Sequence, residues 1–245
     1  MQSPLSLTQT VTTGTVQGTV TDAQGAPLGF AQVVATQQGI TVQGTRTDTN
    51  GQYTLFNVPP GPTTVTATAF DRSGARATLT VSATQTASLP LRLGPPVFDP
   101  TGLVFGPDGN LYVSSRFSPN GVLRYDGQTG AFVDVFVPSA SGGLGSPTGL
   151  VFGPDGNLYV SSNTPNGVLR YDGQTGAFVD VFVPSARGGL GFPRKLVFGP
   201  DDNLYVSDSS QVLRYDGQTG AFVDVFVPLT SGGISDIRGF VFLTP

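Results

Sequence analysis

Aspartate is the most frequent ionisable side chain of this sequence, and it recurs at fixed places in a repeated segment. Each repeat holds one aspartate in a Gly-Pro-Asp turn and one at the start of Asp-Gly-Gln-Thr-Gly: Asp108, Asp155 and Asp201, and Asp126, Asp172 and Asp216. Aspartate in such turns normally accepts hydrogen bonds from its own backbone. A calcium site needs about six to eight converging oxygens, which two side chains per turn do not supply. We therefore interpret these aspartates as turn residues and expect no cofactor, with bound Ca²⁺ or Mg²⁺ as the alternative.

A second charged set also occurs once per repeat. It consists of Arg124, Arg170 and Arg214 in the third apolar run, and Asp134, Asp180 and Asp224 in the fourth. If Asp-Gly-Gln-Thr-Gly is the whole connecting loop, Val122 faces Asp134 and Arg124 is its diagonal neighbour on the same face. This predicts a structural Arg–Asp pair in every repeat. A residue present in every repeat is a poor candidate for a single catalytic site.

A ligand site is expected where the repeats differ from one another. The loops after the second apolar run contain Arg116, Asn163 and Asp208, and the link before the third repeat contains Arg194 and Lys195. If the repeats pack around a common axis, both sets of loops lie on one face, around the mouth of a central channel. These five side chains are the predicted ligand-binding residues. The alternative is that they belong to ordinary solvated loops.

The composition weighs against an enzyme without settling the question. The chain contains no His, Cys or Glu, and Lys195 is its only lysine. Histidine is the usual general base near neutral pH. The formal net charge of -4, with no basic stripe, argues against nucleic acid, and no apolar run reaches the length of a membrane span. We therefore predict a non-catalytic binding or scaffold protein that contacts a glycan or another protein.

Short strands must position these side chains. The equivalent residues Phe105, Phe152, Phe198 and Phe242 are separated by 47, 46 and 44 residues. Each of the first three repeats has four runs rich in Val, Phe, Tyr and Leu between tight turns, which predicts a four-stranded blade of a β-propeller. The fourth run, Phe132–Val137 in the first repeat, is apolar on both faces, as stacked blades require. A flat two-layer sandwich is the alternative.

The first third of the chain predicts a separate small β-sandwich, with short alternating strands from Thr15 to about Leu93. The order of its signals, from Gly18-Thr-Val-Thr-Asp22 through Thr47-Asp-Thr-Asn-Gly to Val58-Pro-Pro-Gly, resembles the carboxypeptidase regulatory-like (prealbumin-like) family. The resemblance implies a non-catalytic accessory module, in a fold group that includes carbohydrate binders.

The repeats resemble NHL-type and virginiamycin B lyase-like propellers. The shared elements are Gly-Leu-x-Phe-Gly-Pro-Asp-Gly-Asn-Leu-Tyr-Val and the following Val-Leu-Arg-Tyr-Asp-Gly-x-Thr-Gly. The resemblance implies an extracellular or scaffold-like protein, in a group that also contains a few lyases and lactone hydrolases. Those lyases use histidine and those hydrolases place a glutamate on their metal, and this chain has neither residue. A metal-dependent lyase or lactone-type hydrolase with its site at the channel mouth is therefore the alternative function.

The predicted fold class is all-β: a small β-sandwich plus a partial β-propeller of three four-stranded blades and the first strand of a fourth, Arg238–Phe242. The predicted domain organisation is a flexible lead-in at 1–14, the sandwich at 15–93, a Pro-rich hinge at 94–97 and the propeller repeats at 98–245.

Three blades are too few to close a propeller, which needs roughly four to eight. An open end blade would leave an apolar face in water. This apolar face could be covered in three ways: by a homodimer that closes a six-bladed ring, by further repeats if the chain is a fragment of a longer array, or by the sandwich as a cap. The expected location is extracellular or at the cell surface, although the sequence shows no signal peptide at Met1.

Overall fold

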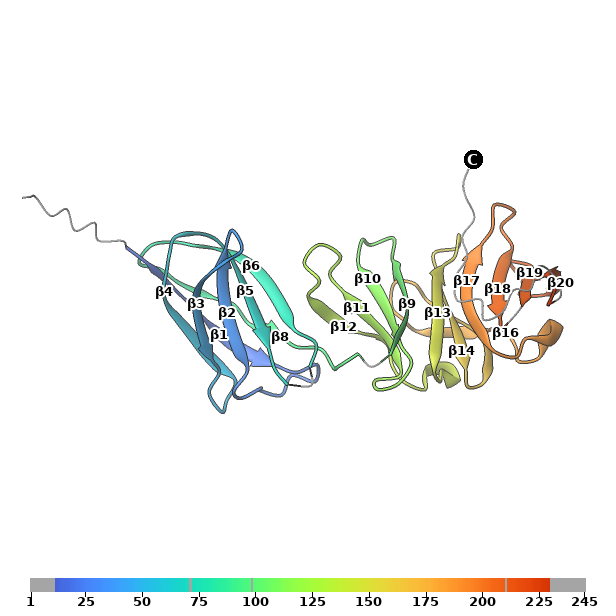
Figure 1. Cartoon of the computed structure of the whole chain (residues 1–245), viewed down its shortest axis with the longest axis horizontal. Coiled ribbons are helices and arrows are strands. Elements are labelled where there is room, and N and C mark those ends of the chain that lie inside the picture. The colour runs from blue at the N-terminus through green and yellow to red at the C-terminus, as the bar shows by residue number, and fades with distance from the viewer. Residues whose placement is uncertain (1–11, 71, 98, 210, 230–245) are drawn as a thin grey trace, which may run out of the picture. The chain divides into compact units, whose positions relative to one another are not determined.

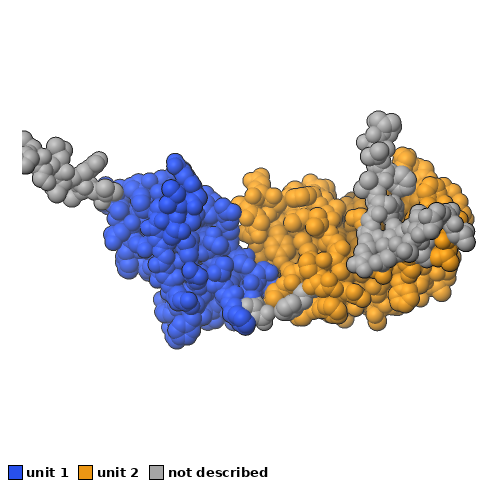
Figure 2. All heavy atoms as spheres, in the orientation of Figure 1, with its two compact units in different colours: residues 1–95 blue, residues 96–245 orange. Residues whose placement is uncertain are grey.

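The computed structural model describes residues 12–70, 72–97, 99–209 and 211–229. The chain divides into two compact units, Met1–Pro95 and Pro96–Pro245, which Figure 2 shows in different colours. Residues 1–11, which belong to the predicted lead-in, and the predicted strand at Arg238–Phe242 lie outside the described residues. Strand β1 already begins at Gly14, the last residue of that lead-in.

The first unit is a sandwich of two four-stranded sheets. In one sheet β1 pairs antiparallel with β4 and parallel with β7 and β8, and in the other the strand order is β3-β2-β5-β6. The strands are β1 Gly14–Thr21, β2 Gln32–Gln37, β3 Ile40–Arg46, β4 Gln52–Val58, β5 Gly61–Thr68, β6 Ala75–Val81, β7 Thr86–Ser88 and β8 Leu91–Arg92. Alternate residues of strands such as β2 and β5 are buried, and the small apolar side chains Val16, Val33 and Val65 meet in a closed core.

In its described residues, the second unit consists of three antiparallel sheets, each formed by four strands in chain order (Figure 1). The first blade contains β9 Pro100–Phe105, β10 Leu111–Ser115, β11 Gly121–Tyr125 and β12 Phe132–Val137. The second contains β13 Pro147–Phe152, β14 Leu158–Asn163, β15 Asn166–Tyr171 and β16 Phe178–Val183. The third contains β17 Pro193–Phe198, β18 Leu204–Asp208, β19 Gln211–Tyr215 and β20 Phe222–Val227. Short 3₁₀ turns, η1 Ser141–Gly143 and η2 Arg187–Gly189, lie in the links between blades.

The first strands of successive blades lie side by side, β9 against β13 and β13 against β17. Thr101 Oγ1 donates a hydrogen bond to the carbonyl oxygen of Pro147 (2.9 Å), and Thr148 Oγ1 donates to that of Pro193 (2.8 Å). Glycine permits this approach, because a Cβ on Gly102 would meet the Thr148 carbonyl oxygen at 2.5 Å. A Thr-Gly pair at the start of a first strand therefore sets the spacing between blades.

The apolar contact between blades occurs twice with the same geometry. Between the first two blades, the ring of Tyr112 packs edge-on against Phe152, with ring centroids 5.0 Å apart. Between the second and third, Tyr159 packs against Phe198 at 5.1 Å. Buried leucines fill the same two interfaces, and burial of such side chains is the main source of their stability. The fold is thus an all-β sandwich followed by part of a β-propeller.

The outer face of the first blade lacks this contact. Leu103 is 64% exposed, whereas the equivalent Leu150 and Leu196 are 1% and 0% exposed. Phe105, two residues after Leu103 on the same strand, is 60% exposed. On this side, the first blade therefore lacks, in the described structure, the neighbour that the second and third blades have. The other end of the stack is also exposed, since Phe226 of the third blade is 46% exposed and the equivalent Phe136 and Phe182 are 5% exposed.

One prediction of strand register is wrong. Val122 pairs with Val137, and Arg124 lies directly opposite Asp134 instead of on a diagonal. The register shifts at two irregularities in this pair of strands, and the same shifts recur in the other two blades. The Arg and Asp side chains therefore meet as direct cross-strand partners.

Candidate functional site

The second unit has a cleft of about 400 Å³ at the ends of its inner strands. Pro100 and Thr101 of β9, Thr148 and Gly149 of β13, and Arg194 and Lys195 of β17 line it from the three blades. Arg116, just after β10, and Asn163, the last residue of β14, also line it, together with Asp99 and Phe192. The structure thus brings together four of the five predicted ligand-binding residues, namely Arg116, Asn163, Arg194 and Lys195.

The third blade has charged residues at the two positions where the other two blades have the Thr-Gly pair that sets the spacing between blades. Arg194 and Lys195 occupy the places that Thr101 and Gly102 hold in the first blade. Apart from this difference, β17 pairs with β18 much as β9 pairs with β10. A short polar residue and a glycine are thus replaced by two long cationic side chains. Because long basic side chains carry their charge several bonds from the backbone, this replacement gives the cleft wall a reach that the first blade lacks.

The fifth predicted residue, Asp208, is not among the residues that line the cleft. It is 5% exposed, and its carboxylate accepts hydrogen bonds from the backbone N–H groups of Gly191 (3.0 Å) and Phe192 (2.7 Å). Asp208 therefore holds the link before β17 in place. Its effect on the cleft is indirect, because that link presents the 59% exposed Phe192 to the cleft. Phe192 was not a predicted site residue.

The cleft is cationic. Its lining contains three basic side chains and one carboxylate, Asp99. Arg116 Nη1 lies 3.8 Å from Asp99 Oδ2, and both side chains are nearly half exposed, so this ion pair is weak and leaves Arg116 accessible to a ligand. The surplus of positive charge lies in a chain whose net charge is -4. Focused charge of this kind attracts anionic groups to the cleft.

The repeated Arg and Asp residues form one network in each blade, away from the cleft. In the second blade, Arg170 Nε donates to Asp180 Oδ1 (3.1 Å), and the Arg170 guanidinium lies 5.1 Å from the centre of the Phe182 ring. Arg170 Nη1 also lies 3.7 Å from the turn residue Asp155. The network joins one turn and two strands of the same sheet, which is a structural role.

The turn aspartates are hydrogen-bonded within their own turns. Asp155 accepts bonds from the backbone N–H of Asn157 (3.0 Å) and from the hydroxyl of Tyr159 (2.9 Å). Partial burial raises the pKa of Asp155, but these hydrogen bonds and the charge of Arg170 outweigh it, so the pKa lies below its ordinary value. Among the described residues there is no group of three or more acidic, His or Cys side chains that could hold a metal ion.

Comparisons with known proteins identify one of the two units by family. Residues 15–94 match the model of the carboxypeptidase regulatory-like domain. No curated protein matches the chain. In the part of the chain that the structure describes, no helix has the length and apolar character needed to cross a membrane.

Solved structures with a similar fold include several propeller proteins. A catalytically inactive virginiamycin B lyase from Staphylococcus aureus, solved with quinupristin, is 14% identical with a TM-score of 0.44, over 69% of this chain and 54% of the lyase. The chain thus spans about half the length of that enzyme. A structure of a nidogen/laminin complex is 19% identical with a TM-score of 0.46, over 86% of this chain and 79% of the matched chain. A protein from Lactobacillus plantarum is 18% identical with a TM-score of 0.41, over 81% and 66% of the two chains.

With TM-scores below 0.5, these likenesses carry no argument about this chain. The three stacked meanders of the second unit independently show that its sheets are propeller blades. Residues 15–94 are therefore a carboxypeptidase regulatory-like domain, followed in this chain by part of a β-propeller.

Proposed function

We propose that this chain is a non-catalytic extracellular binding or scaffold protein whose propeller cleft contacts an anionic group of a glycan or of a protein. The observation that carries the proposal is the grouping of Arg116, Arg194 and Lys195 around one cleft, at positions where the repeats differ. The extracellular location rests on the resemblance of the repeats to propellers that are usually extracellular or scaffold-like.

The chemistry of the cleft supports binding better than catalysis. Guanidinium groups bind carboxylate, sulfate or phosphate through paired hydrogen bonds, and lysine adds a compact charge. The lining contains no paired acid and base that would activate a water molecule or a nucleophile, because its one carboxylate, Asp99, faces Arg116. No described feature favours the metal-dependent lyase or hydrolase.

The repeats themselves provide matched variants for the test. Lys195→Gly gives the third blade the residue that the second blade has at Gly149, and it removes one cation from the cleft. Arg187→Ser gives the link before the third blade the residue that the previous link has at Ser141, and it removes one cation outside the cleft lining. Both variants restore a sequence that the fold already uses, so both are expected to fold.

The assay is binding of the full chain to an array of sulfated, uronic-acid and neutral glycans and of acidic peptides, followed by titration of the best probe. A charge-assisted hydrogen bond contributes about 1.5–3 kcal/mol, so Lys195→Gly is expected to weaken binding by about tenfold or more. Arg187→Ser is expected to change it less than about twofold. Equal effects of the two variants, or equal binding of neutral and acidic probes, would contradict the proposal.

A further inference from the structure

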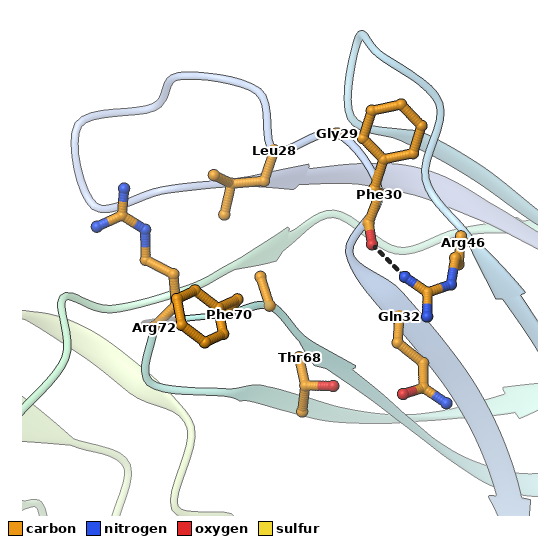
Figure 3. Close-up of a pocket in the computed structure, with 9 residues that line it drawn as sticks. Leu28, Gly29, Phe30, Gln32, Arg46, Thr68, Phe70 and Arg72 are labelled. Carbon is orange, nitrogen blue, oxygen red and sulfur yellow. Dashed lines mark hydrogen bonds between the residues drawn. The ribbon is translucent and has the colours of Figure 1, made fainter.

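The sandwich unit contains a hollow of its own, of about 630 Å³, at one end of the β3-β2-β5-β6 sheet (Figure 3). We call it the sandwich site. Its lining comes from the link before β2, the first residue of β2, the last residue of β3 and the end of β5 with the residues after it. The side chains that matter to the argument are Phe30, Gln32, Arg46, Thr68, Phe70 and Arg72.

Strand register places the polar part of the sandwich site in one row. Gln32 on β2 pairs with Arg46 on β3 and with Thr68 on β5, so the three residues lie side by side across three strands. All three are exposed, whereas the next residue along β2, Val33, is fully buried in the core. The row therefore faces solvent, and its guanidinium, amide and hydroxyl groups are accessible to a ligand.

Two exposed aromatic rings flank this row. Phe30 precedes Gln32 by two residues and is 68% exposed, and Phe70 follows Thr68 by two residues and is 100% exposed. An apolar ring gains about 1.5–3 kcal/mol when it is removed from water. Two such rings beside one hollow therefore favour a ligand that offers apolar C–H faces as well as polar groups.

The segment that carries Phe30 is held in place by a buried threonine. Thr47 is 3% exposed; its hydroxyl donates to the carbonyl oxygen of Leu28 (2.6 Å) and accepts from the N–H of Ala31 (2.9 Å). The N–H of Phe30 donates to the Thr47 carbonyl oxygen (3.1 Å), and Arg46 Nη1 donates to the Phe30 carbonyl oxygen (3.2 Å; Figure 3).

These bonds hold Phe30 at a positive φ of 61°, a conformation that is costly for an aromatic residue. A strained residue that the surrounding bonds fix in place is a common feature of binding sites, because the site is already organised before the ligand arrives. The exposure of the Phe30 ring is thus built into the fold of this segment.

The charge of the sandwich site indicates the sign of its ligand. Arg46 and Arg72 both line it, and none of the described lining residues is acidic. An apolar ligand would leave the guanidinium, amide and hydroxyl groups without hydrogen bonds, which is unfavourable. A ligand with an apolar face, several hydroxyls and a negative charge satisfies all three kinds of group at once.

We propose that the sandwich site binds an acidic saccharide, with Phe30 and Phe70 stacking on the sugar rings, Arg46 and Arg72 pairing with carboxylate or sulfate, and Gln32 and Thr68 bonding hydroxyls. A hollow of 630 Å³ lies within the size range of small-ligand sites. The site belongs to the other unit of the chain, so it does not depend on the function proposed for the propeller cleft.

The sandwich site is tested by calorimetric titration of the full-length chain with three trisaccharides: tri-galacturonate, sulfated galactotriose and neutral galactotriose. Phe70→Ala and Arg72→Gln are the test variants. Phe56→Ala is the matched control, because Phe56 is also a largely exposed phenylalanine (64%) but lies on β4 in the other sheet. Lys195→Gly is included to report on the propeller cleft separately.

We expect at least one of the two acidic trisaccharides to bind, and Phe70→Ala and Arg72→Gln each to weaken that binding by about fivefold or more, a change that corresponds to about 1 kcal/mol. Comparison of the carboxylated with the sulfated probe identifies which anion the arginines prefer. Phe56→Ala and Lys195→Gly are expected to change binding at this site less than twofold.

Three results would overturn the inference: binding of galactotriose as tight as that of the acidic probes, equal effects of Phe70→Ala and Phe56→Ala, or no binding of either acidic probe. Loss of binding in Lys195→Gly with no effect of Phe70→Ala would refute the sandwich site and support the propeller cleft, so the two proposals fail separately. Because Phe70 is fully exposed, its replacement is not expected to impair folding.

Discussion

The three equivalent leucines of the inner strands provide an internal measure of what a neighbouring blade contributes. Leu103, Leu150 and Leu196 have the same place in three nearly identical repeats, but Leu103 is 64% exposed and the other two are almost fully buried. Replacement of a buried leucine by alanine removes its transfer free energy and leaves a cavity, and it typically costs about 2–5 kcal/mol. We expect Leu150→Ala and Leu196→Ala to destabilise the second unit by such an amount.

For Leu103 the expected loss is much smaller. Full burial of a leucine contributes about 1.5–3 kcal/mol, and roughly a third of this side chain is buried, so Leu103→Ala should cost below about 1 kcal/mol. No closed cavity forms at an open face, so no cavity term is added. The free energy of unfolding can be measured in urea by tyrosine fluorescence, since the chain has no tryptophan and six of its seven tyrosines belong to the second unit.

Equal destabilisation by Leu103→Ala and Leu150→Ala would refute the reasoning, because it would mean that the face of the first blade is buried in solution. We propose two covers for that face. A second copy of this chain, closing a six-bladed ring, would bury Leu103 and give this result, whereas further repeats of a longer array would leave Leu103 exposed in the chain studied alone. Light scattering at several protein concentrations separates them. A second copy would double the mass and make the cost of Leu103→Ala depend on concentration.

Two further predictions concern the repeated charged residues. Arg170→Ala removes the bonds to Asp180 and the contact with the Phe182 ring, and it should lower the free energy of unfolding in urea by about 1–2 kcal/mol. Arg170→Lys should recover only part of this loss. Full recovery would exclude a role for the paired guanidinium geometry. The pKa of Asp155 lies below its ordinary value of 3.8, so the stability that this carboxylate contributes is complete above that value and is lost as the pH falls through the lowered folded-state pKa. The urea midpoint should therefore drop below about pH 4, and it should drop less in Asp155→Asn. The same dependence of the midpoint on pH in that variant would contradict the assignment.

Much of the fold is predictable from the sequence because the turn residues of each repeat mark where its strands begin and end. The Gly-Pro-Asp and Asp-Gly-Gln-Thr-Gly turns mark every hairpin, so four strands per blade follow from turn chemistry. The register of the outer pair is not predictable in this way. A strand such as Phe132–Val137 is apolar on both faces, so alternation cannot show where its partner shifts by one residue.

The cleft was predictable where it depends on differences between repeats, and not where it depends on loop conformation. Arg194 and Lys195 stand out because they replace Thr and Gly, and the structure places both in the cleft with Arg116 and Asn163. Asp208 differs between repeats equally clearly, but its carboxylate is bonded to two backbone N–H groups of a link, which only the folded loop shows. Sequence variation alone does not distinguish a side chain that lines a cleft from one that supports its wall.

The sameness of the two blade interfaces has a consequence for how the chain assembles. Tyr112 meets Phe152 as Tyr159 meets Phe198, so the surface that a blade offers to its correct neighbour fits an incorrect neighbour equally well. Side-chain chemistry therefore does not specify which blade follows which; the short covalent links do. While the protein is being synthesised, this arrangement is safe because neighbours emerge in order. Among many unfolded copies at high concentration, the same surfaces permit exchange of blades between chains, so refolding yield should depend on dilution more than on the stability of any one blade.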